Sequence, residues 1–562
     1  MYRQRPEPVG SVLRCATGSK RSDSAAVPTN PSPSGSKAGR SQPACIKDTQ
    51  VQLQYDQRWI EELPGDPERH VHPRQVHGAL WSPVMPTPVA APRLLAWSST
   101  LRTLLRLDDL DDPTGSLGLF AGNRLLPGWR PWSSNYGGHQ FGHWAGQLGD
   151  GRAISLVEGI ASDGQRLELQ LKGAGPTPYS RRADGRAVLR SSLREFICSE
   201  AMHHLGVPTT RALCLVATGE SVERDMFYDG RPQLEPGAIV CRAAPSFIRF
   251  GHFELPASRG DVALLTQLVD FCIDRDFPHF RGQPDARERW FGEVCERTAE
   301  LVAHWLRVGF VHGVMNTDNL SILGLTIDYG PYGWLEQTDP DWTPNTTDFE
   351  GRRYCFGRQP QIALWNLTQL AGALLDTVLD REALQAGLAR YQSCFAQTQQ
   401  RHNLAKLGLR SDETGLSRRW WALLQAAALD YTLAHRWLMA PAEQIDIDAL
   451  AAISYDSTAF QRQRPDLHDW LQAYRAQLTQ QGIDDSDRLA PMRTANPLYV
   501  PRNYLAQLAI DAASAGDPGE LQQWQAVLRR PYEAQEGAER FAAPRPEWAR
   551  HRPGCSMLSC SS

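Results

Sequence analysis

The chain has 562 residues, with 59 Lys or Arg against 63 Asp or Glu, so its formal net charge is −4. This balance supplies no chain-wide positive field and argues against a nucleic-acid-binding protein. A hydrophobic content of 41% and a charged content of 22% are typical of a globular chain and exclude disorder throughout. No apolar stretch reaches the about 18 residues of a membrane-spanning helix, so no membrane association is expected.

The eleven cysteines are irregularly spaced, and no secretory hydrophobic segment begins the chain. A disulfide framework is therefore not expected, and a reducing compartment is the default. No CxxC pair or His/Cys cluster has the spacing of a zinc site. Any metal ion is expected to bind to oxygen ligands.

Residues 1–50 contain eight Ser, six Pro and four Gly without apolar periodicity, which predicts a disordered extension. The segment is rich in Arg and Lys and poor in acids, as a mitochondrial transit peptide is. A non-structural extension or a mis-assigned start is the simpler interpretation. We expect a cytoplasmic protein, with the mitochondrial matrix as the alternative.

The rest of the chain divides into three parts, which together predict an α+β fold. Residues 51–255 are dense in Gly, short alternating runs and turn signals, which predicts a β-rich lobe. Residues 256–484 show long segments with helical periodicity and predict a helical lobe, and residues 485–562 form a C-terminal extension. The clearest predicted helices cover Val262–Ile273, Arg297–Val308 and Tyr504–Ala513.

Lysine is rare in this chain: only five of the 59 basic residues are Lys, and two of these, Lys172 and Lys406, lie beyond residue 50. Lys172 ends the run Leu167–Lys172, in which alternation places three leucines on one face and Glu168, Gln170 and Lys172 on the other. A retained ammonium at this point favours a phosphate contact over a solvated strand end. Lys406 has no such setting and is interpreted as a surface residue.

A glycine-rich turn, Gly146–Arg152, precedes the β-type run Ala153–Val157. Glycines allow backbone N–H groups to approach a phosphate closely, although Asp150-Gly151 is also a strong hairpin signal. Between the two lobes lie Arg242 and Arg249. They could clamp phosphates or be ordinary surface cations.

The motif Ser192–Glu195 matches a capping box and predicts a helix that runs to about Leu205. In kinase-like enzymes a helix glutamate holds the phosphate-binding lysine, and Glu195 could hold Lys172 in that way. Glu200, on the same predicted helix, is a second candidate for that role. The alternatives are a role in the capping box alone for Glu195 and a solvated position for Glu200.

The sharpest constellation is the loop His312–Asn319, which follows a predicted helix ending near Gly309. The kinase pattern H-R-D-L-x-x-x-N aligns His312 and Asn319 but places Val314 where the catalytic aspartate belongs. Valine cannot accept a proton, so ordinary phosphoryl transfer is not possible with that base. Asp318, later in the same loop, supplies a carboxylate that is displaced from the position of the kinase base. A hairpin over residues 320–327 could bring Asn319 and Asp328 together as oxygen ligands for Mg²⁺.

On these motifs the chain resembles the selenoprotein O family of kinase-like protein nucleotidyltransferases, from about residue 55 to the end. The segments that carry the resemblance are Asn135–Gly142, Gly146–Arg152, Gln170–Tyr179, Asp184–Arg186, Arg190–Leu205, His312–Asn319 and Asn496–Ala513. The resemblance implies a bilobal protein-kinase-like fold that binds ATP in a flipped orientation and transfers AMP to Ser, Thr or Tyr hydroxyls of proteins.

The resemblance also implies the roles of individual residues. Asp318 is the expected catalytic base, and Asn319 and Asp328 are the expected ligands of Mg²⁺, with Mn²⁺ as an alternative. Glu195 is the expected partner of Lys172. The expected nucleotide contacts are Gly149, Gly151, Arg152, Lys172, Asp184, Gly185, Glu195, Arg242, Arg249 and Asp328.

Two other functions remain open from the sequence: a regulatory pseudokinase that binds nucleotide without turnover, and a phosphotransferase with Asp318 as base. A monomer is expected. Some family members place selenocysteine third from the C-terminus in a Cys-x-x-Sec pair. Here Cys560 has that position and Met557 replaces the paired cysteine. Cys555 and Cys560 could form a redox pair, but two solvent-exposed tail thiols are the simpler expectation.

Overall fold

The computed structural model describes residues 51–107, 112, 115–226 and 229–559. The predictions for residues 1–50 and for Cys560 lie outside these residues. All described residues belong to one compact unit. The domain boundaries at residues 255 and 484 therefore stay predictions. Within the described part of the chain, no helix has the length and apolar character that crossing a membrane would need.

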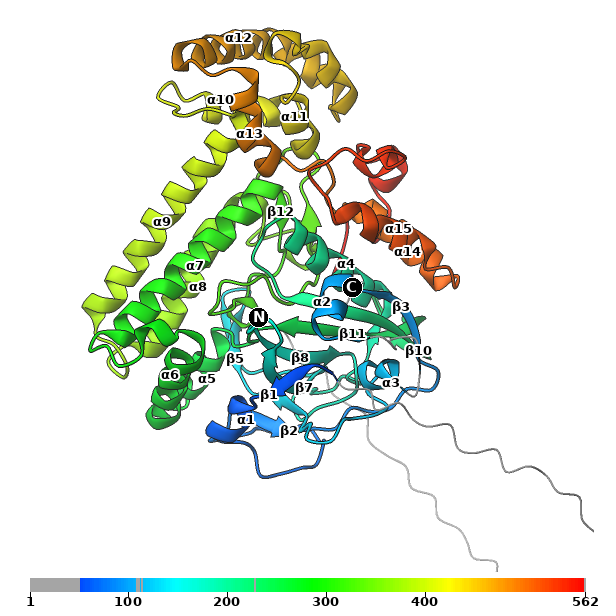
Figure 1. Cartoon of the computed structure of the whole chain (residues 1–562), viewed down its shortest axis with the longest axis vertical. Coiled ribbons are helices and arrows are strands. Elements are labelled where there is room, and N and C mark those ends of the chain that lie inside the picture. Colours follow the sequence, from blue (N-terminus) through cyan, green and yellow to red (C-terminus); the bar gives the residue numbers. More distant parts are fainter. Residues whose placement is uncertain (1–50, 108–111, 113–114, 227–228, 560–562) are drawn as a thin grey trace, which may run out of the picture. The chain divides into compact units, whose positions relative to one another are not determined.

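A sheet of nine described strands, which differ in length, forms most of the N-terminal part (Figure 1). Its main path runs β2-β4-β7-β8-β11-β10-β3, while β1 pairs with β7 and β9 with β11. Every ladder between these strands is antiparallel. The strands are β1 (Leu53–Tyr55), β2 (Trp81–Pro83), β3 (Arg93–Trp97), β4 (Trp132–Ser134), β7 (Ala153–Ala161), β8 (Arg166–Lys172), β9 (Ala187–Val188), β10 (Arg211–Arg224) and β11 (Gln233–Ala244).

Strand β8 has the alternation that the sequence predicts, but both of its faces are covered. Leu167, Leu169 and Leu171 lie in a core that also takes residues from β7, β10 and β11. The polar face is buried as well, because Glu168 and Gln170 are only 5% and 0% exposed. Side chains cover this polar face: Glu168 accepts from Ser155 Oγ at 2.5 Å, and Gln170 Oε1 accepts from Arg242 Nη2.

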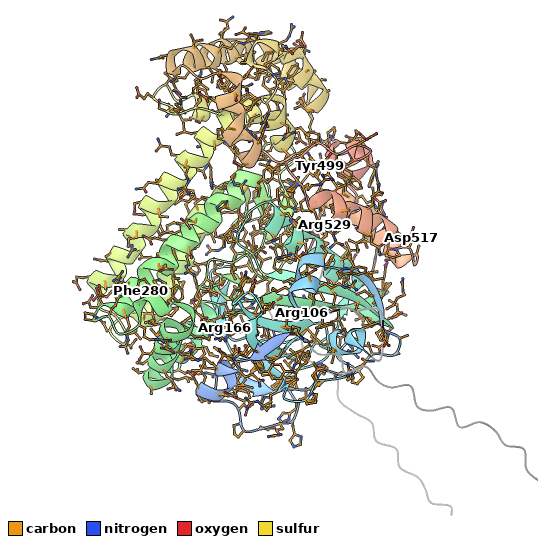
Figure 2. All side chains as sticks on the ribbon, in the orientation of Figure 1. Arg106, Arg166, Phe280, Tyr499, Asp517 and Arg529 are labelled. Carbon is orange, nitrogen blue, oxygen red and sulfur yellow. The ribbon has the colours of Figure 1, made fainter. Side chains whose placement is uncertain are left out.

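Helix α4 (Leu189–His204) lies between the sheet and the C-terminal extension. Its apolar side chains share one core with β10, β11 and helices α14 (Asn503–Ser514) and α15 (Gly519–Leu528). Tyr499, labelled in Figure 2, belongs to the same core. The extension therefore packs on the sheet-bearing part of the molecule, although it follows the helical part in the sequence.

The region from residue 251 to 495 is mainly helical, which confirms the expected α+β fold with a β-rich N-terminal lobe and a helical C-terminal lobe. Its helices are α5 (Gly251–Ser258), α6 (Val262–Asp276), α7 (Ala286–Val308), α8 (Gln359–Leu374), α9 (Arg381–Leu407), α10 (Leu416–Ala426), α11 (Tyr431–Trp437), α12 (Ser457–Gln481) and α13 (Asp485–Ala495). The predicted helices around Val262–Ile273, Arg297–Val308 and Tyr504–Ala513 are confirmed as parts of α6, α7 and α14.

The described chain also contains short elements, besides 3-10 turns such as Thr317–Asn319. They are helices α1 (Arg58–Glu62), α2 (Ser99–Leu104) and α3 (Ser116–Phe120), the ribbon of β5 (Gly137–Gln140) and β6 (His143–Gln147), and the pair β12 (Phe310–Val311) and β13 (Gly333–Trp334). The predicted hairpin over residues 320–327 contains no extended strands. It is reduced to one antiparallel bridge between Leu320 and Thr326.

The prediction that Lys406 lies at the surface is wrong. It is 5% exposed, because α9 packs on α13 there and Nζ donates to Asn496 Oδ1, 90 residues away, at 3.3 Å. Glu200 takes neither of the roles left open for it. It is 4% exposed, and Arg211 of strand β10 donates to both of its carboxylate oxygens at 2.6 and 2.8 Å.

Candidate active site

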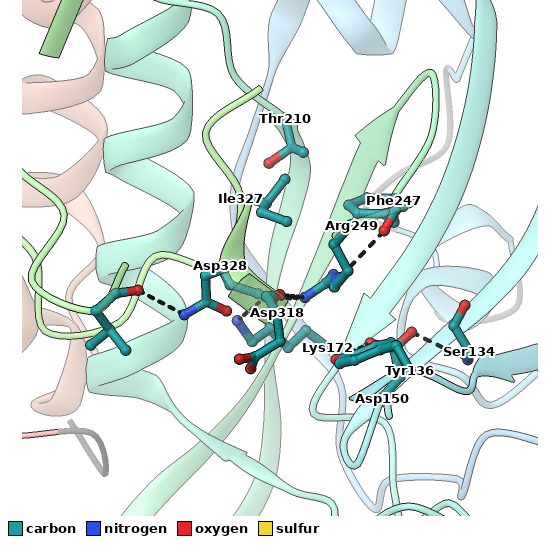
Figure 3. Close-up of polar contacts among 12 residues, drawn as sticks. Ser134, Tyr136, Asp150, Lys172, Thr210, Phe247, Arg249, Asp318, Ile327 and Asp328 are labelled. Carbon is teal, nitrogen blue, oxygen red and sulfur yellow. Dashed lines mark hydrogen bonds and ion pairs between the residues drawn. The ribbon is translucent and has the colours of Figure 1, made fainter. Parts of the chain in front are cut away.

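The centre of the candidate site is the carboxylate of Asp328, which three cations surround, and Figure 3 shows two of them, Lys172 and Arg249. Its Oδ1 lies 3.1 Å from Lys172 Nζ and 2.5 Å from Arg242 Nη1, and its Oδ2 accepts from Arg249 Nη1. Burial by itself raises the pKa of Asp328, but the charges of Arg249, Lys172 and Arg242 hold it well below the ordinary value. Asp328 is thus ionised, and it lies in the left-handed region with φ of 54°.

Lys172 also forms an ion pair with Glu195, with Nζ 2.9 Å from Oε2. Arg242 Nη1 reaches the other carboxylate oxygen of Glu195 at 3.1 Å. The pairing of a strand lysine with a helix glutamate is confirmed as a contact, and it is the arrangement found in kinase-like enzymes. The predicted capping box is wrong, because α4 begins at Leu189 and Ser192 donates to the carbonyl of Ala238 instead.

Sheet register explains why these side chains meet. Lys172 pairs with Val240 across the β8–β11 ladder, and Gln170 pairs with Arg242. Residues two apart on a strand point to the same side, so Lys172, Gln170 and Arg242 share one face. Arg242 Nη2 donates to Gln170 Oε1 in the structure. Sequence reasoning placed Gln170 on this face but assigned it no role in the site.

The glycine-rich turn does not present free N–H groups to a ligand. Gly149 N donates to Tyr136 O at 3.0 Å, Asp150 N to Ser134 O at 2.9 Å, and Gly151 N to Gly149 O at 3.0 Å. Gly149 is required here because a Cβ would lie 2.4 Å from the Tyr179 ring at a φ of +69°. The expectation that these N–H groups cradle phosphate is therefore not met in this conformation.

Arg152 and Asp184 differ in how close they are to the cluster. Arg152 directly precedes β7, its carbonyl accepts from Gly173 N at 2.7 Å, and the charges of Glu195 and Asp328 act on its guanidinium. Asp184 instead forms an ion pair with Arg224 at 2.7 Å and is 46% exposed. Gly185 packs on Gly175, whose N donates to its carbonyl at 3.1 Å. The structure brings Arg152 to the cluster and leaves Asp184 and Gly185 at its edge, without a contact to Lys172 or Asp328.

The loop His312–Asn319 is buried beside this cluster. His312 Nε2 donates to Ile327 O at 3.1 Å, which joins the loop to the residue before Asp328. Arg249 Nη1 donates to the carbonyl of Asp318 at 2.9 Å. Val314 offers only its carbonyl, which accepts from Asn319 Nδ2 at 2.9 Å. Asp318 therefore remains the one carboxylate of the loop.

Asp318 is 8% exposed, and burial raises its pKa to about 7, although a hydrogen bond from Gln140 opposes the increase. Gln140 Nε2 donates to Oδ2 at 3.2 Å, whereas Oδ1 is buried without a partner among the described residues. An unpaired buried acceptor is costly. It is also what a residue needs in order to take a proton from an incoming hydroxyl.

The β5–β6 ribbon covers this loop, and sequence reasoning did not foresee that contact. His139 N donates to Thr317 Oγ1 at 2.7 Å, and His139 Nδ1 lies 2.7 Å from Glu254 Oε1. Thr317 Oγ1 in turn donates to the same carboxylate. A Cβ on Gly138 would lie only 2.7 Å from Asp318 Oδ1. The motif Asn135–Gly142 carried the family resemblance, and its two adjacent glycines were the available signal for such a close approach.

Tyr136 and Asp150 form a second set of contacts that sequence reasoning did not predict, and these contacts support Arg249. The Arg249 guanidinium lies 4.7 Å from the centroid of the Tyr136 ring, a cation–π contact. Tyr136 OH donates to Asp150 Oδ1 at 3.0 Å, and Asp150 Oδ2 accepts from Ser134 N at 3.3 Å (Figure 3). This chain of contacts connects the glycine-rich turn to the cation that binds Asp328.

The predicted metal ligands have suitable chemistry. Because Asn319 uses its Nδ2 to donate to Val314 O, its Oδ1 is left as an oxygen donor. Asp328 is an ionised carboxylate, and the bridge between Leu320 and Thr326 brings the two segments together. Amide and carboxylate oxygens are ligands that Mg²⁺ accepts. The described residues contain no group of three or more His, Cys, Asp or Glu that could hold a metal ion without further ligands.

The expectation of a solvent-exposed tail thiol is wrong for Cys555. This residue is 4% exposed, and burial raises the pKa of its thiol to about 11. It lies in the core that α4 shares with α14 and α15. A buried thiol with a raised pKa is a poor nucleophile and a poor redox centre.

The fold and the site define a kinase-like nucleotide-binding class, with a strand lysine paired to a helix glutamate beside a loop that carries a displaced carboxylate. The family model described as protein adenylyltransferase SelO matches residues 73–529. The chain therefore belongs to the protein adenylyltransferase SelO family, whose members are protein nucleotidyltransferases, and the predicted resemblance is confirmed.

Relatives with known names agree with this assignment. The chain is 60% identical over 517 residues to a protein nucleotidyltransferase YdiU of Xanthomonas euvesicatoria pv. vesicatoria, covering 91% of this chain and 99% of the relative. It is 59% identical over 517 residues to the YdiU protein of Xanthomonas axonopodis pv. citri, with the same coverage.

Among solved structures, ROP2 from Toxoplasma gondii is described as having a protein-kinase fold and no enzymatic activity. It is 13% identical at a TM-score of 0.22, covering 60% of this chain and 87% of that chain. A likeness this low supports no conclusion about this protein.

Proposed function

We propose that this protein transfers AMP from ATP to Ser, Thr or Tyr hydroxyls of other proteins and releases pyrophosphate. The observation that carries the proposal is the state of the loop His312–Asn319. Val314 stands where a kinase has its base, while Asp318 presents a buried oxygen that no described residue pairs with, and burial raises the pKa of its carboxyl to about 7. Family membership supports the same reaction.

The residues of the site have separate roles in this proposal. Lys172, Arg242 and Arg249 converge on one point and would bind the triphosphate, with Glu195 holding Lys172 and Arg242 in place. The acceptor oxygen attacks the α-phosphorus, the bond from that phosphorus to the bridging oxygen breaks, and pyrophosphate leaves. Asp318 takes the hydroxyl proton. Fixed cations around a buried reaction centre stabilise developing charge without reorganisation.

Asn319 and Asp328 would hold a divalent cation, Mg²⁺ or alternatively Mn²⁺. When bound, such an ion supplies neutralisation of the triphosphate charge. Lys172, Arg242 and Arg249 would then either contact the Asp328 carboxylate together with the ion, or contact the phosphates instead. The roles of Gly149, Gly151, Asp184 and Gly185 in binding nucleotide stay proposals, and the first two require a change in the hydrogen bonds of the turn.

The deciding experiment uses ATP labelled at either the α- or the γ-phosphate, with Mg²⁺ and a protein acceptor such as casein. Attached α-label, with an AMP-sized increase in mass, is the expected result. Attached γ-label would show a phosphotransferase and refute the argument from Val314. Neither label, with measurable ATP binding, would show a regulatory pseudokinase.

A matched pair of variants tests the base. Asp318→Asn keeps the shape of the side chain but cannot accept a proton, so transfer is expected to fall by about 10³-fold while ATP binding remains. Asp517→Asn changes an exposed aspartate in the C-terminal extension (Figure 2) and is expected to behave as wild type. Equal activity in both variants would show that Asp318 is not the base.

A cytoplasmic location and a monomeric state belong to the same proposal. They rest on the family, on the absence of a disulfide framework in the sequence and on the buried state of most described cysteines. Size-exclusion chromatography with light scattering tests the monomer, and an increase in mass to twice that of the chain would refute it.

A further inference from the structure

A cavity lies in the helical region, and none of the residues of the candidate active site lines it. It has a volume of about 740 Å³ and is formed by α9, α10, α11 and the segment that carries Pro340, Phe356 and Gly357. Pockets of about 300–1,000 Å³ are the size that small-molecule ligands fill. None of the expected nucleotide or metal residues lines it. We call it the Lys406 cavity after its most unusual residue.

Aromatic rings form much of its wall. Trp421 stacks on Phe356 with ring centroids 5.7 Å apart and an interplanar angle of 14°. Trp421 also meets Tyr431 edge to face at 5.7 Å. Phe395 and Trp420 line the cavity as well. Such a wall favours a ligand with a flat aromatic body or an acyl chain.

Lys406 places an amine in this apolar setting without an acidic partner. It is 5% exposed, its Nζ donates to Asn496 Oδ1 at 3.3 Å, and it lies 4.9 Å from the centroid of the Tyr431 ring. None of the ion pairs among the described residues includes it. Burial, with a smaller effect of Arg307, lowers its pKa well below the ordinary value. A buried amine of this kind lacks a compensating negative charge.

The other polar groups of the lining leave Lys406 as its buried charge without an ion pair among the described residues. Asp412 already accepts from Leu416 N at 2.7 Å and from Ser417 N at 2.9 Å, so its carboxylate is occupied. Arg418 is exposed. Trp420 Nε1 and Gln399 Oε1 have no hydrogen-bond partner in the described chain, but both atoms are enclosed in the wall and do not face the cavity.

We propose that the Lys406 cavity binds an amphipathic carboxylate, with an aromatic or acyl body against Trp421 and Phe356 and a carboxylate that Lys406 recognises. A carboxylate would supply the missing partner of the buried amine.

One wall of the cavity is also connected to the loop of the active site. Tyr354, two residues before Phe356, donates from its hydroxyl to Asn316 Oδ1 at 2.7 Å. The same hydroxyl accepts from Phe141 N at 2.9 Å. A bound ligand would thus restrain a segment that reaches both the catalytic loop and the β5–β6 ribbon. The binding of a ligand to the Lys406 cavity does not depend on the proposed transfer reaction.

The test is calorimetric titration of the full chain with octanoate and with 1-naphthoate. We expect one site for each, and binding of the neutral counterparts 1-octanol and 1-naphthalenemethanol at least about tenfold weaker. Lys406→Met keeps the aliphatic stem but removes the charge, and is expected to weaken only the carboxylates, by about tenfold or more. Arg529→Met removes an exposed cation of the extension (Figure 2) and should change nothing.

A second variant and a locating measurement complete the design. Ala396 lines the cavity from an exposed position on α9, so Ala396→Trp would narrow it and is expected to weaken binding of acid and alcohol alike. Hydrogen exchange with bound octanoate is expected to slow over residues 395–421 and 340–357. No binding at millimolar concentrations, or wild-type binding by both Lys406→Met and Ala396→Trp, would overturn the proposal. Because no transfer is measured, these outcomes are independent of the proposed function.

Discussion

At the scale of single residues, close backbone approach matters as much as charge. Gly138 lies against Asp318 so tightly that a methyl group would meet Oδ1 at 2.7 Å and the Asp318 Cβ at 2.9 Å. Its backbone does not need a positive φ, so the requirement for glycine is purely steric. The ribbon can therefore press on the candidate base only because this position has no side chain.

The prediction that follows concerns Gly138→Ala. The added methyl group would displace the Asp318 carboxylate, and kcat for transfer is expected to fall by about 10²-fold with little change in the KM for ATP. Gly372→Ala is the control, since a Cβ there meets nothing within 4 Å. Steady-state kinetics with both variants check the prediction, and an unchanged kcat for Gly138→Ala would contradict it.

Glu168 offers a residue-scale prediction about stability and pH. It is buried, accepts from Ser155 Oγ at 2.5 Å, and burial raises its pKa to about 7. A carboxyl whose folded pKa is raised contributes stability below its ordinary pKa of 4.5, and that contribution is lost as the pH rises towards 7. At pH 8 the buried charge costs up to about 3 kcal/mol.

Glu168→Gln should therefore raise the free energy of unfolding at pH 8, by about 2 kcal/mol, and have little effect at pH 5. Urea denaturation at the two pH values is the measurement. Glu536→Gln, at an exposed position, is the control and should be neutral at both. A stabilisation that does not depend on pH would show that the charge of Glu168 is not its cause.

At the scale of elements, a buried ion pair at the start of α14 adds to the apolar packing of this helix. Arg502, the residue before α14, donates to both oxygens of Asp430 at 2.8 and 3.0 Å. Asp430 also caps α11 through Leu433 N at 3.0 Å and accepts from Tyr455 OH at 2.8 Å. The pair thus connects the C-terminal extension to the helical region.

Removal of one partner from such a pair leaves a buried, uncompensated charge. Arg502→Met is expected to destabilise the protein by about 3–5 kcal/mol. The exposed Arg529→Met should change stability by less than about 0.5 kcal/mol. Thermal unfolding followed by circular dichroism compares the two, and equal melting temperatures would show that the ion pair adds nothing to the docking of α14.

At the scale of the whole molecule, Asp328 joins the two parts of the fold. It follows the loop of the helical region, whereas Lys172 and Arg242 come from adjacent strands of the sheet. A ligand that binds these cations and a metal on Asp328 should therefore stabilise both parts together. The β5–β6 ribbon adds a second connection, through Thr317 and Asp318.

ATP with Mg²⁺ is accordingly expected to raise the melting temperature by about 2–4 °C, and a chelator should remove much of that increase. In Asp328→Asn the difference between Mg²⁺ and chelator should vanish, because the anionic ligand is lost. Asp517→Asn should retain it. A thermal shift that is equal with and without Mg²⁺ in the wild type would argue against a metal site at Asp328.

Much of the fold and part of the site followed from local sequence patterns. Alternation in Leu167–Lys172 predicted β8, helical periodicity predicted α6 and α7, and the glycine after Val308 predicted the end of α7. The pairing of Lys172 with Glu195 was also predicted, although through a capping box that does not form. The start of α4 was missed because strand β9 leads directly into the helix and replaces a capping signal.

What the sequence by itself determined is a β-rich part before a helical part, the displaced carboxylate at Asp318 and the family, because periodicity and motifs are local properties. Only the tertiary structure decided which charges are buried and what they touch. Lys406 and Cys555 were expected at the surface, yet segments distant in sequence cover both of them. The same holds for the N–H groups of the glycine-rich turn, which carbonyls of Ser134 and Tyr136 occupy. Burial depends on partners brought together by folding, and no local pattern records them.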